Sequence, residues 1–379
     1  MTMGFLRRKT ERLMMQRRGD LPASSSGFER MLFTCSQVYQ LGVKLRLCLY
    51  DRRVLHPKGL PCQVLSIGNI TVGGTGKTPM VSYVANLLKG FGVRVAVMSR
   101  GYGGYAQRSG GIVSDGRTTL MGPEASGDEP QLLASKLKGI PLLVGKDRYG
   151  AGREAIRRFG ASVLVLDDGF QHLALKRDVD LLLMDSTHPF GNGYCIPRGL
   201  LREPVSQIKR ASAFVLTRWA GDRHWDSQRS TLEAHAPGRP IFRCRHVPES
   251  LFVAGEDRPV DLVSLKGQRL FAFSGIGRND AFRDTVSGLG GKIVAFLEFS
   301  DHHRYAHRDI EYIWQRATDH GVDSIITTEK DLVNVGTDIP STPTLLVLAV
   351  GISFGDEAEA FTSYLKNEMI AQAPMGSDF

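Results

Sequence analysis

The chain has 379 residues, enough for two packed units at roughly 100–200 residues per domain, and its composition is that of a globular protein. Its net charge is +9, and residues 1–60 hold 12 basic but only 4 acidic side chains, so the remainder is nearly neutral. A nucleic-acid-reading protein would spread basic surface over the domain that does the reading, so this distribution excludes nucleic acid as the expected partner.

The N-terminal segment is basic and lacks a secretory signal, because charged residues interrupt MTMGFLRRKTERLMMQRRGD and leave no apolar core. LPASSSG at 21–27 is a small polar linker, so residues 1–27 are predicted to form a basic flexible tail. The five cysteines include no C-x-x-C pair, which favours a reducing compartment.

Residues 28–60 are predicted to contain an amphipathic helix, over 28–53. Apolar side chains recur at helical spacing from Met31 to Leu49, and polar ones group on another side. The best apolar window, from Met31 to Val43, has 13 residues free of charge, short of the roughly 18–20 that span a bilayer. Two interpretations stay open: the helix packs on the core, or it lies in a membrane interface, which the basic flanks favour.

From residue 61 short apolar strands alternate with glycine turns and helices. In 61–238 the predicted strands lie at 63–68, 93–98, 140–145, 162–167, 180–185 and 212–217. This alternation is typical of an α/β fold with a mostly parallel sheet flanked by helices. Residues near 238–260 read as extended connections. A second, smaller α/β domain is predicted in 239–379, with strands at 269–274, 292–299, 323–328 and 344–350.

A glycine-rich turn follows the first strand and indicates phosphate binding. Its residues are Gly73, Gly74, Thr75, Gly76, Lys77, Thr78 and Pro79. Glycines let backbone N–H groups converge on a phosphate, the lysine reaches the β- and γ-phosphates, and the threonine hydroxyl holds Mg²⁺. Pro79 suits the first turn of the next helix, whose N-terminus favours an anion. Thr71 stands where the strict pattern has glycine, but the order of elements predicts a nucleotide-binding P-loop.

A carboxylate is expected at the end of a neighbouring strand, where it can hold the magnesium ion. SVLVLDDGFQH at 162–172 places Asp167 and Asp168 directly after four aliphatic residues. Because adjacent side chains of an extended chain point to opposite sides, one of the two faces the metal, and Asp167 is the predicted one.

Three further motifs offer groups for the acceptor. SRGYGGY at 99–105 follows the second strand, at the sheet edge where open α/β proteins bind ligands. In ASGDEP at 125–130, Asp128 is either the N-cap of a helix expected from Pro130 or a functional carboxylate. FSDHHRYAHRD at 299–309 groups Asp301 with several histidines, as a metal site or as a carboxylate–histidine pair that helps to deprotonate a hydroxyl. GIGRND at 275–280 begins like a dinucleotide fingerprint but reads as a strand-to-helix turn.

The motifs VGGTGKTP, SRGYGG, GDEP, LVLDDGFQH, PRGLLREP and SDHH, in this order, resemble the tetraacyldisaccharide 4′-kinases, the lipid A 4′-kinase family. The resemblance extends from about residue 30 to the C-terminus, and DDGFQH with GLLREP is its most specific part. It implies transfer of the γ-phosphate of ATP, with Mg²⁺, to the 4′-hydroxyl of a tetra-acylated glucosamine disaccharide 1-phosphate. It further implies a peripheral protein on the cytoplasmic face of a Gram-negative inner membrane, which we expect to be a monomer.

The resemblance also implies roles for individual residues. Lys77 and Thr78 would hold the ATP phosphates and magnesium, with Asp167 in the metal shell and Asp168 beside it. Asp128 would accept the hydroxyl proton. His302 would assist Asp128, with Asp301 and Glu129 supporting, and Glu129 would also be a metal ligand. Contacts to the phosphorylated sugar headgroup would come from Arg100, Tyr102, Arg202 and Glu203.

Two expectations about the whole molecule follow. Because Asp128 lies in the first predicted domain and His302 in the second, the domains are expected to close over bound nucleotide, assemble the base and exclude water. A lipid with four acyl chains leaves a bilayer at a cost of about 0.8 kcal/mol per methylene, so the helix at 28–53 is expected to bring the enzyme to the membrane. The tail before residue 27 is longer than the resemblance implies.

Two alternatives stay open. A switch-type P-loop ATPase or GTPase has a similar GG-x-GK-T loop, but such proteins usually carry a lysine directly before the paired glycines, where Val72 stands. A non-enzymatic membrane adaptor is the other, and the intact set of Lys77, Thr78 and Asp167 disfavours it. Robust hydrolysis of nucleotide without a lipid acceptor would favour the first.

Overall fold

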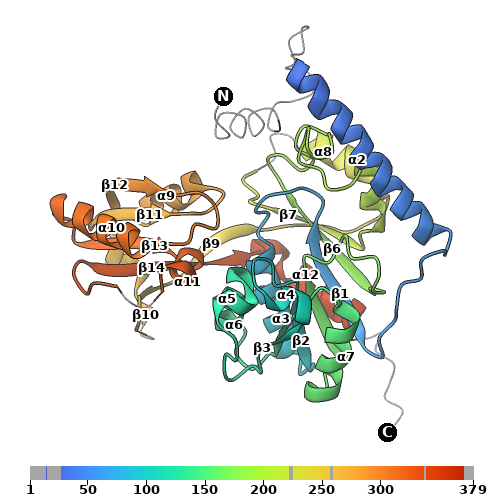
Figure 1. Ribbon diagram of the computed structural model, residues 1–379, viewed down its shortest axis with the longest axis horizontal. Coiled ribbons are helices and arrows are strands. Elements are labelled where there is room, and N and C mark those ends of the chain that lie inside the picture. The colour runs from blue at the N-terminus through green and yellow to red at the C-terminus, as the bar shows by residue number, and fades with distance from the viewer. Residues whose placement is uncertain (1–13, 15–26, 222–224, 257–258, 337–338, 371–379) are drawn as a thin grey trace. The chain divides into compact units, whose positions relative to one another are not determined.

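A computed structural model describes residue 14 and residues 27–221, 225–256, 259–336 and 339–370 (Figure 1). The chain divides into two compact units. Unit 1 comprises Met1–Met98, Arg148–Arg245 and Ser353–Phe379, and unit 2 comprises Ser99–Asp147 and His246–Ile352. This division differs from the expected one, because residues 99–147 cluster with the C-terminal part and not with the P-loop domain. The predicted basic tail falls, apart from residue 14 and Gly27, outside the described residues.

Unit 1 is built on a parallel sheet. Its strands are six of the eight in one sheet, in the order β2-β5-β1-β6-β7-β8, and each neighbouring pair among these six is parallel. Their bounds are β1 (Gln63–Asn69), β2 (Val95–Ser99), β5 (Val163–Asp167), β6 (Val179–Asp185), β7 (Ala213–Thr217) and β8 (Ile241–Arg243). Strands covered on both faces need continuous apolar runs, and every residue of β1, β2, β5 and β7 is buried. The predicted mostly parallel sheet is confirmed, and β8 forms within the stretch expected to be a connection.

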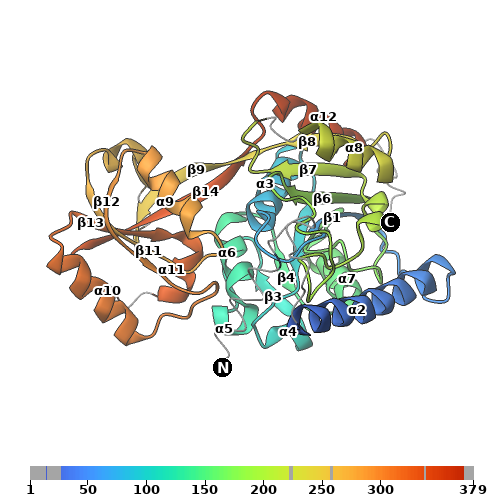
Figure 2. The same cartoon turned by 90° about the horizontal axis from the view of Figure 1, so that it is seen from above.

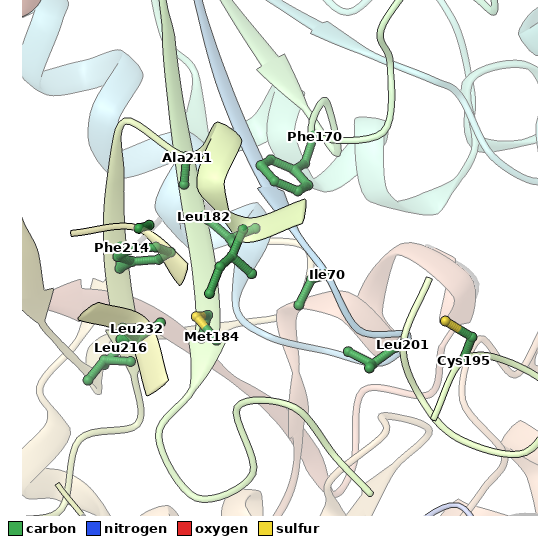
Figure 3. Packing of buried hydrophobic residues seen from close by; sticks show 12 residues of the cluster. Ile70, Phe170, Leu182, Met184, Cys195, Leu201, Ala211, Phe214, Leu216 and Leu232 are labelled. Carbon is green, nitrogen blue, oxygen red and sulfur yellow. The ribbon is translucent and has the colours of Figure 1, made fainter. Parts of the chain in front are cut away.

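Helices cover this sheet and complete its core. They are α2 (Gly27–Asp51), α3 (Lys77–Gly90), α7 (Arg148–Phe159), α8 (Trp225–His235) and α12 (Ala358–Met369), with the short η1 (Val205–Arg210) and η3 (Gly355–Glu357). Figure 3 shows one core cluster, in which Phe170 from the DDGFQH motif lies with Leu182 of β6 and Phe214 of β7. A Cβ at Gly68 would lie 2.6 Å from the Cβ and 2.7 Å from the N of Phe170, so glycine at this position lets the Phe170 backbone lie close to β1.

One side of α2 packs on unit 1 and the other is exposed. On the packed side, Ser36 Oγ donates to the carbonyl of Cys195 at 2.8 Å, and Tyr39 Oη donates to the carbonyl of Arg202 at 2.9 Å. The exposed side carries an apolar stripe whose members are 52–68% exposed: Met31, Val38, Leu41 and Leu45. Among the described helices, none combines the length and hydropathy that a bilayer crossing needs.

Unit 2 contains β3 (Gly111–Ser114) and β4 (Leu142–Val144), an antiparallel pair that follows β2 in the eight-stranded sheet, and a six-stranded sheet. The sheet order is β10-β9-β14-β13-β11-β12. The bounds are β9 (Arg245–Val253), β10 (Pro259–Val260), β11 (Arg269–Ser274), β12 (Lys292–Glu298), β13 (Ser324–Thr328) and β14 (Thr344–Ser353). The helices are α4 (Ala106–Ser109), α5 (Pro123–Ser126), α6 (Asp128–Lys136), α9 (Asn279–Gly288), α10 (His307–Asp319), α11 (Glu329–Val335) and η2 (Leu262–Leu265). The sequence reading missed β3, β9 and β10.

The side-chain alternation of β11 explains why this sheet is covered on both faces. Leu270 and Ala272 pack in the cluster that contains Phe282 of α9. Phe271 and Phe273 point to the other face and pack with Trp314 of α10. Accordingly, α9 and α10 lie on opposite sides of the sheet in Figure 2. GIGRND connects β11 to α9, which confirms the predicted strand-to-helix turn.

Candidate functional site

The glycine-rich loop lies between β1 and α3, as the sequence predicts. Gly73 and Gly76 have φ angles of 109° and 81°, a region that favours glycine. Gly76 is the N-cap of α3, and no described side chain caps this helix. A Cβ at Gly73 or Gly74 would meet no atom within 4 Å, so the loop backbone borders open space. Free helix N–H groups beside an open glycine backbone fit a phosphate group.

Two residues that the sequence reading missed hold the loop in shape. Asn69, the fully buried last residue of β1, donates from Nδ2 to Thr75 Oγ1 at 3.0 Å and to the Gly73 carbonyl at 3.4 Å. Arg218 donates to the carbonyl of Gly74 at 2.5 Å and pairs with Asp185 at the end of β6. An asparagine directly after an apolar run was the available signal for Asn69, and nothing in the sequence singled out Arg218.

Asp168 lies between two cations next to this loop. Its Oδ1 is 3.7 Å from Nζ of Lys77, and Nη1 of Arg202 donates to both of its oxygens at 2.8 Å. Asp168 has a φ of 52°, the left-handed conformation that turns its carboxylate out of the β5 direction. Burial alone would raise the pKa of Asp168, but Lys77 and Arg202 outweigh it and lower the pKa. The carboxylate is therefore held ionised beside the P-loop lysine.

Asp167 is the last residue of β5, the strand that neighbours β1. Its register partner in β1 is Ile67, two residues before the strand ends, and Asp167 is buried. The buried Arg148, another residue that the sequence reading missed, donates to the carbonyl of Asp167 at 3.0 Å and to that of Met98 at 2.7 Å. An acidic residue at the end of a strand beside the P-loop strand fits the metal-binding position that the sequence predicts for Asp167.

The PRGLLREP segment is a structural partner of the loop. Val72 N donates to the carbonyl of Leu200 at 2.7 Å, and Arg202 N donates to that of Ile70 at 2.8 Å, so this segment runs beside the chain between β1 and the glycines. Glu203 differs from the expectation that it contacts a headgroup. It is 3% exposed and pairs with Arg210, and burial raises its pKa. A carboxylate this enclosed supports the segment rather than a ligand.

Asp128 and His302 form a hydrogen-bonded pair inside unit 2. Asp128 is the first residue of α6, and Gly127 is the N-cap, so the capping interpretation of Asp128 is wrong. Its Oδ2 lies 2.6 Å from Nδ1 of His302. Burial alone would raise the pKa of Asp128, but the His302 hydrogen bond and the charges of His302 and Lys330 lower it to about 2. The bond to Asp128 raises the pKa of His302, against burial and Lys330.

Because both members belong to unit 2, no closure of the two units is needed to bring Asp128 and His302 together. The division into compact units thus groups the two residues together, where the sequence predicts two domains, while β3 and β4 on either side of α6 belong to the sheet of β1, as that prediction has them. The physical reason is that α6 packs on α11 of the same unit, where Lys136 at the end of α6 pairs with Glu329 at 2.8 Å. Residues 99–147 lie between β2 and α7 in the chain. Their strands β3 and β4 follow β2 in the eight-stranded sheet, while their helix α6 packs on α11.

The other histidines and acceptor residues have separate positions. His303 faces Asp309 at 3.1 Å and stacks near Phe299, so His302 is the member of SDHH that meets Asp128. Within the described ranges, no group of three or more His, Cys, Asp or Glu side chains is arranged to hold a metal. Thr78 and Pro79 lie in the first turn of α3 in unit 1. The remaining predicted site residues lie in unit 2, with Glu129 second in α6 and half-buried, and with two exposed side chains, Arg100 and Tyr102.

Comparison with known proteins assigns a family to this combination of sites. The model of the family described as tetraacyldisaccharide-1-P 4′-kinase (LpxK) matches residues 28–370. The chain is similar to the tetraacyldisaccharide 4′-kinase of Syntrophus aciditrophicus, at 46% identity over 318 residues, 82% of this chain and 85% of that protein. It is also similar to that of Desulfatibacillum aliphaticivorans, at 42% identity over 378 residues, 97% of this chain and 99% of that protein.

A solved structure gives the same result. The "apo" form of LpxK from Aquifex aeolicus in complex with ATP has a TM-score of 0.71 and 30% identity, and the match covers 90% of this chain and 99% of that one. These matches extend through both units and do not favour a switch-type ATPase or GTPase. The P-loop of unit 1, the carboxylate–histidine pair of unit 2 and the full-length matches agree, and the chain belongs to the tetraacyldisaccharide-1-P 4′-kinase family.

Proposed function

We propose that this chain transfers the γ-phosphoryl group of ATP to the 4′-hydroxyl of a tetraacyldisaccharide 1-phosphate, the reaction that its family name describes. The observation that carries the proposal is the 2.6 Å contact between Asp128 and His302. A P-loop alone serves hydrolysis and transfer equally. An oriented carboxylate at a helix N-terminus adds the group that a hydroxyl acceptor requires.

The ATP side of the reaction belongs to unit 1. The N-terminus of α3 and Lys77 would hold the phosphates, because the helix N–H groups and an ammonium both favour their charge. Thr78 and Asp167 would hold the magnesium ion, with Glu129 as the further ligand implied by the resemblance. When bound, magnesium would neutralise the charge on the β- and γ-phosphate oxygens. Asp168 would orient Lys77 through their 3.7 Å contact.

The acceptor side belongs to unit 2. Asp128 would take the proton of the 4′-hydroxyl while the new bond forms between the 4′-oxygen and the γ-phosphorus and the bond to the ADP oxygen breaks. A carboxylate with a pKa of about 2 is a weak base. That is sufficient where transfer depends mainly on positioning and charge stabilisation. The resemblance assigns headgroup contacts to Arg100, Tyr102 and Arg202. Closure of the units over nucleotide stays a prediction.

Membrane association is the second part of the proposal. A lipid acceptor stays in the bilayer, so the enzyme must reach it there. The exposed apolar stripe of α2 is the surface that supports this role. The helix exposes these apolar side chains on one side while its other side packs on unit 1, and basic residues lie near both of its ends. The protein would then act as a monomer at the cytoplasmic face of the inner membrane, as the resemblance implies.

Transfer of labelled γ-phosphate to the disaccharide lipid in detergent micelles tests the proposal. Asp128→Asn should lower the transfer rate by about 10²–10⁴-fold, because it removes the proton acceptor and keeps the shape. Lys77→Ala should lower it comparably by removing the phosphate ligand. The matched controls are exposed residues of the same two units, Lys89→Ala in α3 and Asp284→Ala in α9, which should keep full activity. Phosphate release to water that is unchanged by the lipid, with no labelled lipid, would contradict the proposal.

A further inference from the structure

Lys330 completes a chain of polar contacts behind Asp128 that the family motifs do not include. It is the second residue of α11, whose N-cap Thr328 accepts a hydrogen bond from Asp331 N. Its Nζ lies 2.8 Å from Oδ1 of Asp301 and 3.3 Å from Nε2 of His302. One ammonium therefore contacts the ring nitrogen that points away from Asp128.

The backbone fixes the orientation of His302. Its φ is 59°, a left-handed conformation that costs free energy for a residue other than glycine. Its N–H donates to the carbonyl of Gly275 at 3.2 Å, which holds that conformation. The ring is thereby placed with Nδ1 on Asp128 and Nε2 on Lys330.

The chemistry of the two neighbours selects one tautomer. An ammonium has three donors and no acceptor, so Lys330 forms a hydrogen bond with Nε2 only when that nitrogen carries a lone pair. The single ring proton then lies on Nδ1, where the carboxylate of Asp128 accepts it. The charged groups that face the ring are Asp128 from α6, Asp301 from the same loop and Lys330 from α11. Of these, Lys330 alone opposes a positive charge on the ring.

We propose that Lys330 is a positioning residue for the phosphoryl transfer: it donates to Nε2 of His302 and so directs the only proton of a neutral imidazole at Asp128. Asp301 holds the ammonium in place. The neutral ring leaves Asp128 less strongly paired than an imidazolium would, and so keeps the carboxylate able to accept the hydroxyl proton. The kinetic part of this inference rests on the proposed function.

The tautomer can be measured without any substrate. In the wild-type full-length chain labelled with ¹⁵N-histidine, we expect the Nδ1 of His302 to be protonated and its Nε2 unprotonated at a pH above the titration of the ring. The signal is assigned by its loss in His302→Gln. A proton on Nε2 would overturn the inference whether or not the chain transfers phosphate, and it needs no Lys330 variant to fold.

The pH profile of kcat/KM tests the consequence. Lys330→Met should move the acidic limb to higher pH by about one unit, because a cation beside the ring no longer opposes its protonation. Lys330→Arg keeps the charge and should restore the wild-type limb. Lys292→Met, at an exposed lysine of the same unit, should leave the profile unchanged. A lower rate with an unmoved limb in Lys330→Met would reduce Lys330 to a structural ion pair with Asp301, and full activity with an unmoved limb would also overturn the inference.

Discussion

Asp168 and Asp128 are both carboxylates with basic neighbours, but their surroundings favour different roles, positioning for Asp168 and proton acceptance for Asp128. Asp168 is held by Arg202 at 2.8 Å and approached by Lys77, so its charge is committed to positioning. Asp128 has one close partner, His302, and stands at the N-terminus of α6, where the helix dipole favours its ionised form. Environment rather than residue type therefore separates a supporting carboxylate from a candidate base.

The pair of Asp128 and His302 should make stability depend on pH. The pKa of Asp128 falls from 3.8 to about 2, so its contribution is complete above pH 3.8 and is lost as the pH falls towards 2. The pKa of His302 rises above 6.5, so its contribution is complete below pH 6.5 and is lost as the pH rises through the folded value. The free energy of unfolding of the wild type should therefore exceed that of His302→Gln most between these limits.

Urea unfolding of both proteins across this pH range measures the difference. His307→Gln is the matched control, because His307 pairs with Glu311 on the surface, where ion pairs contribute little. A difference between wild type and His302→Gln that stays constant from acid to alkaline pH would show that the pair carries no linked protonation.

At the scale of elements, two helices have faces that periodicity alone does not assign. The apolar stripe of α2 from Met31 to Leu45 is the exposed side, while the side that packs on unit 1 uses Leu32, Ser36 and Leu47. The two ends of α6 make different contacts. Asp128, its first residue, pairs with His302, and Lys136, its last residue, pairs with Glu329 of α11. Burial raises the pKa of Glu329, so its pairing with Lys136 compensates a desolvated charge.

Replacing part of the α2 stripe should weaken membrane binding without unfolding the protein. Leu41→Gln with Leu45→Gln removes two exposed apolar side chains, so sedimentation with anionic lipid vesicles should fall while the melting temperature stays close to that of the wild type. A second double variant, Leu120→Gln with Val263→Gln, removes comparable exposed apolar surface from unit 2 and should bind as the wild type does. Equal sedimentation of all three proteins would refute an interfacial role for α2.

At the scale of the whole molecule, nucleotide and acceptor groups are divided between two units. Lys77, Asp167 and Asp168 belong to unit 1, and Asp128 and His302 belong to unit 2. ATP with magnesium should therefore raise the melting temperature of wild type and of Asp128→Asn alike, since a ligand at 100 times its Kd stabilises by about 2.7 kcal/mol. Lys77→Ala should lose most of this rise.

Thermal unfolding with and without ATP, read beside the transfer assay, separates the two roles. Asp128→Asn should bind nucleotide and fail in transfer, whereas Lys77→Ala should fail in both. A Lys77→Ala protein that keeps the full thermal shift would place the nucleotide away from this loop, and an Asp128→Asn protein that loses the shift would show that Asp128 acts in nucleotide binding.

Local sequence patterns were sufficient to predict the elements that depend only on residues close together in the chain. The strands β1, β5, β7 and β11 lie within one residue of their predicted ranges, because apolar runs between glycine turns report parallel strands directly. The helix α2 was predicted from the helical spacing of its apolar residues, and the phosphate loop at 73–78 from its glycines, lysine and threonine. The segments β3, β9 and β10 were missed, because β3 and β10 are short and the nine-residue β9 has only one buried residue, so none of them carries a clear apolar run.

The sequence by itself determined the α/β class, the P-loop, the acidic pair after β5 and the family resemblance, because each depends on residues close together in the chain. Only the tertiary structure decided that Asp128 meets His302, that Asp168 lies at Lys77, that Glu203 is enclosed and that residues 99–147 group with unit 2. It also added Asn69, Arg218 and Lys330. Those relations join residues far apart in sequence, and packing between elements sets them, so no local pattern encodes them.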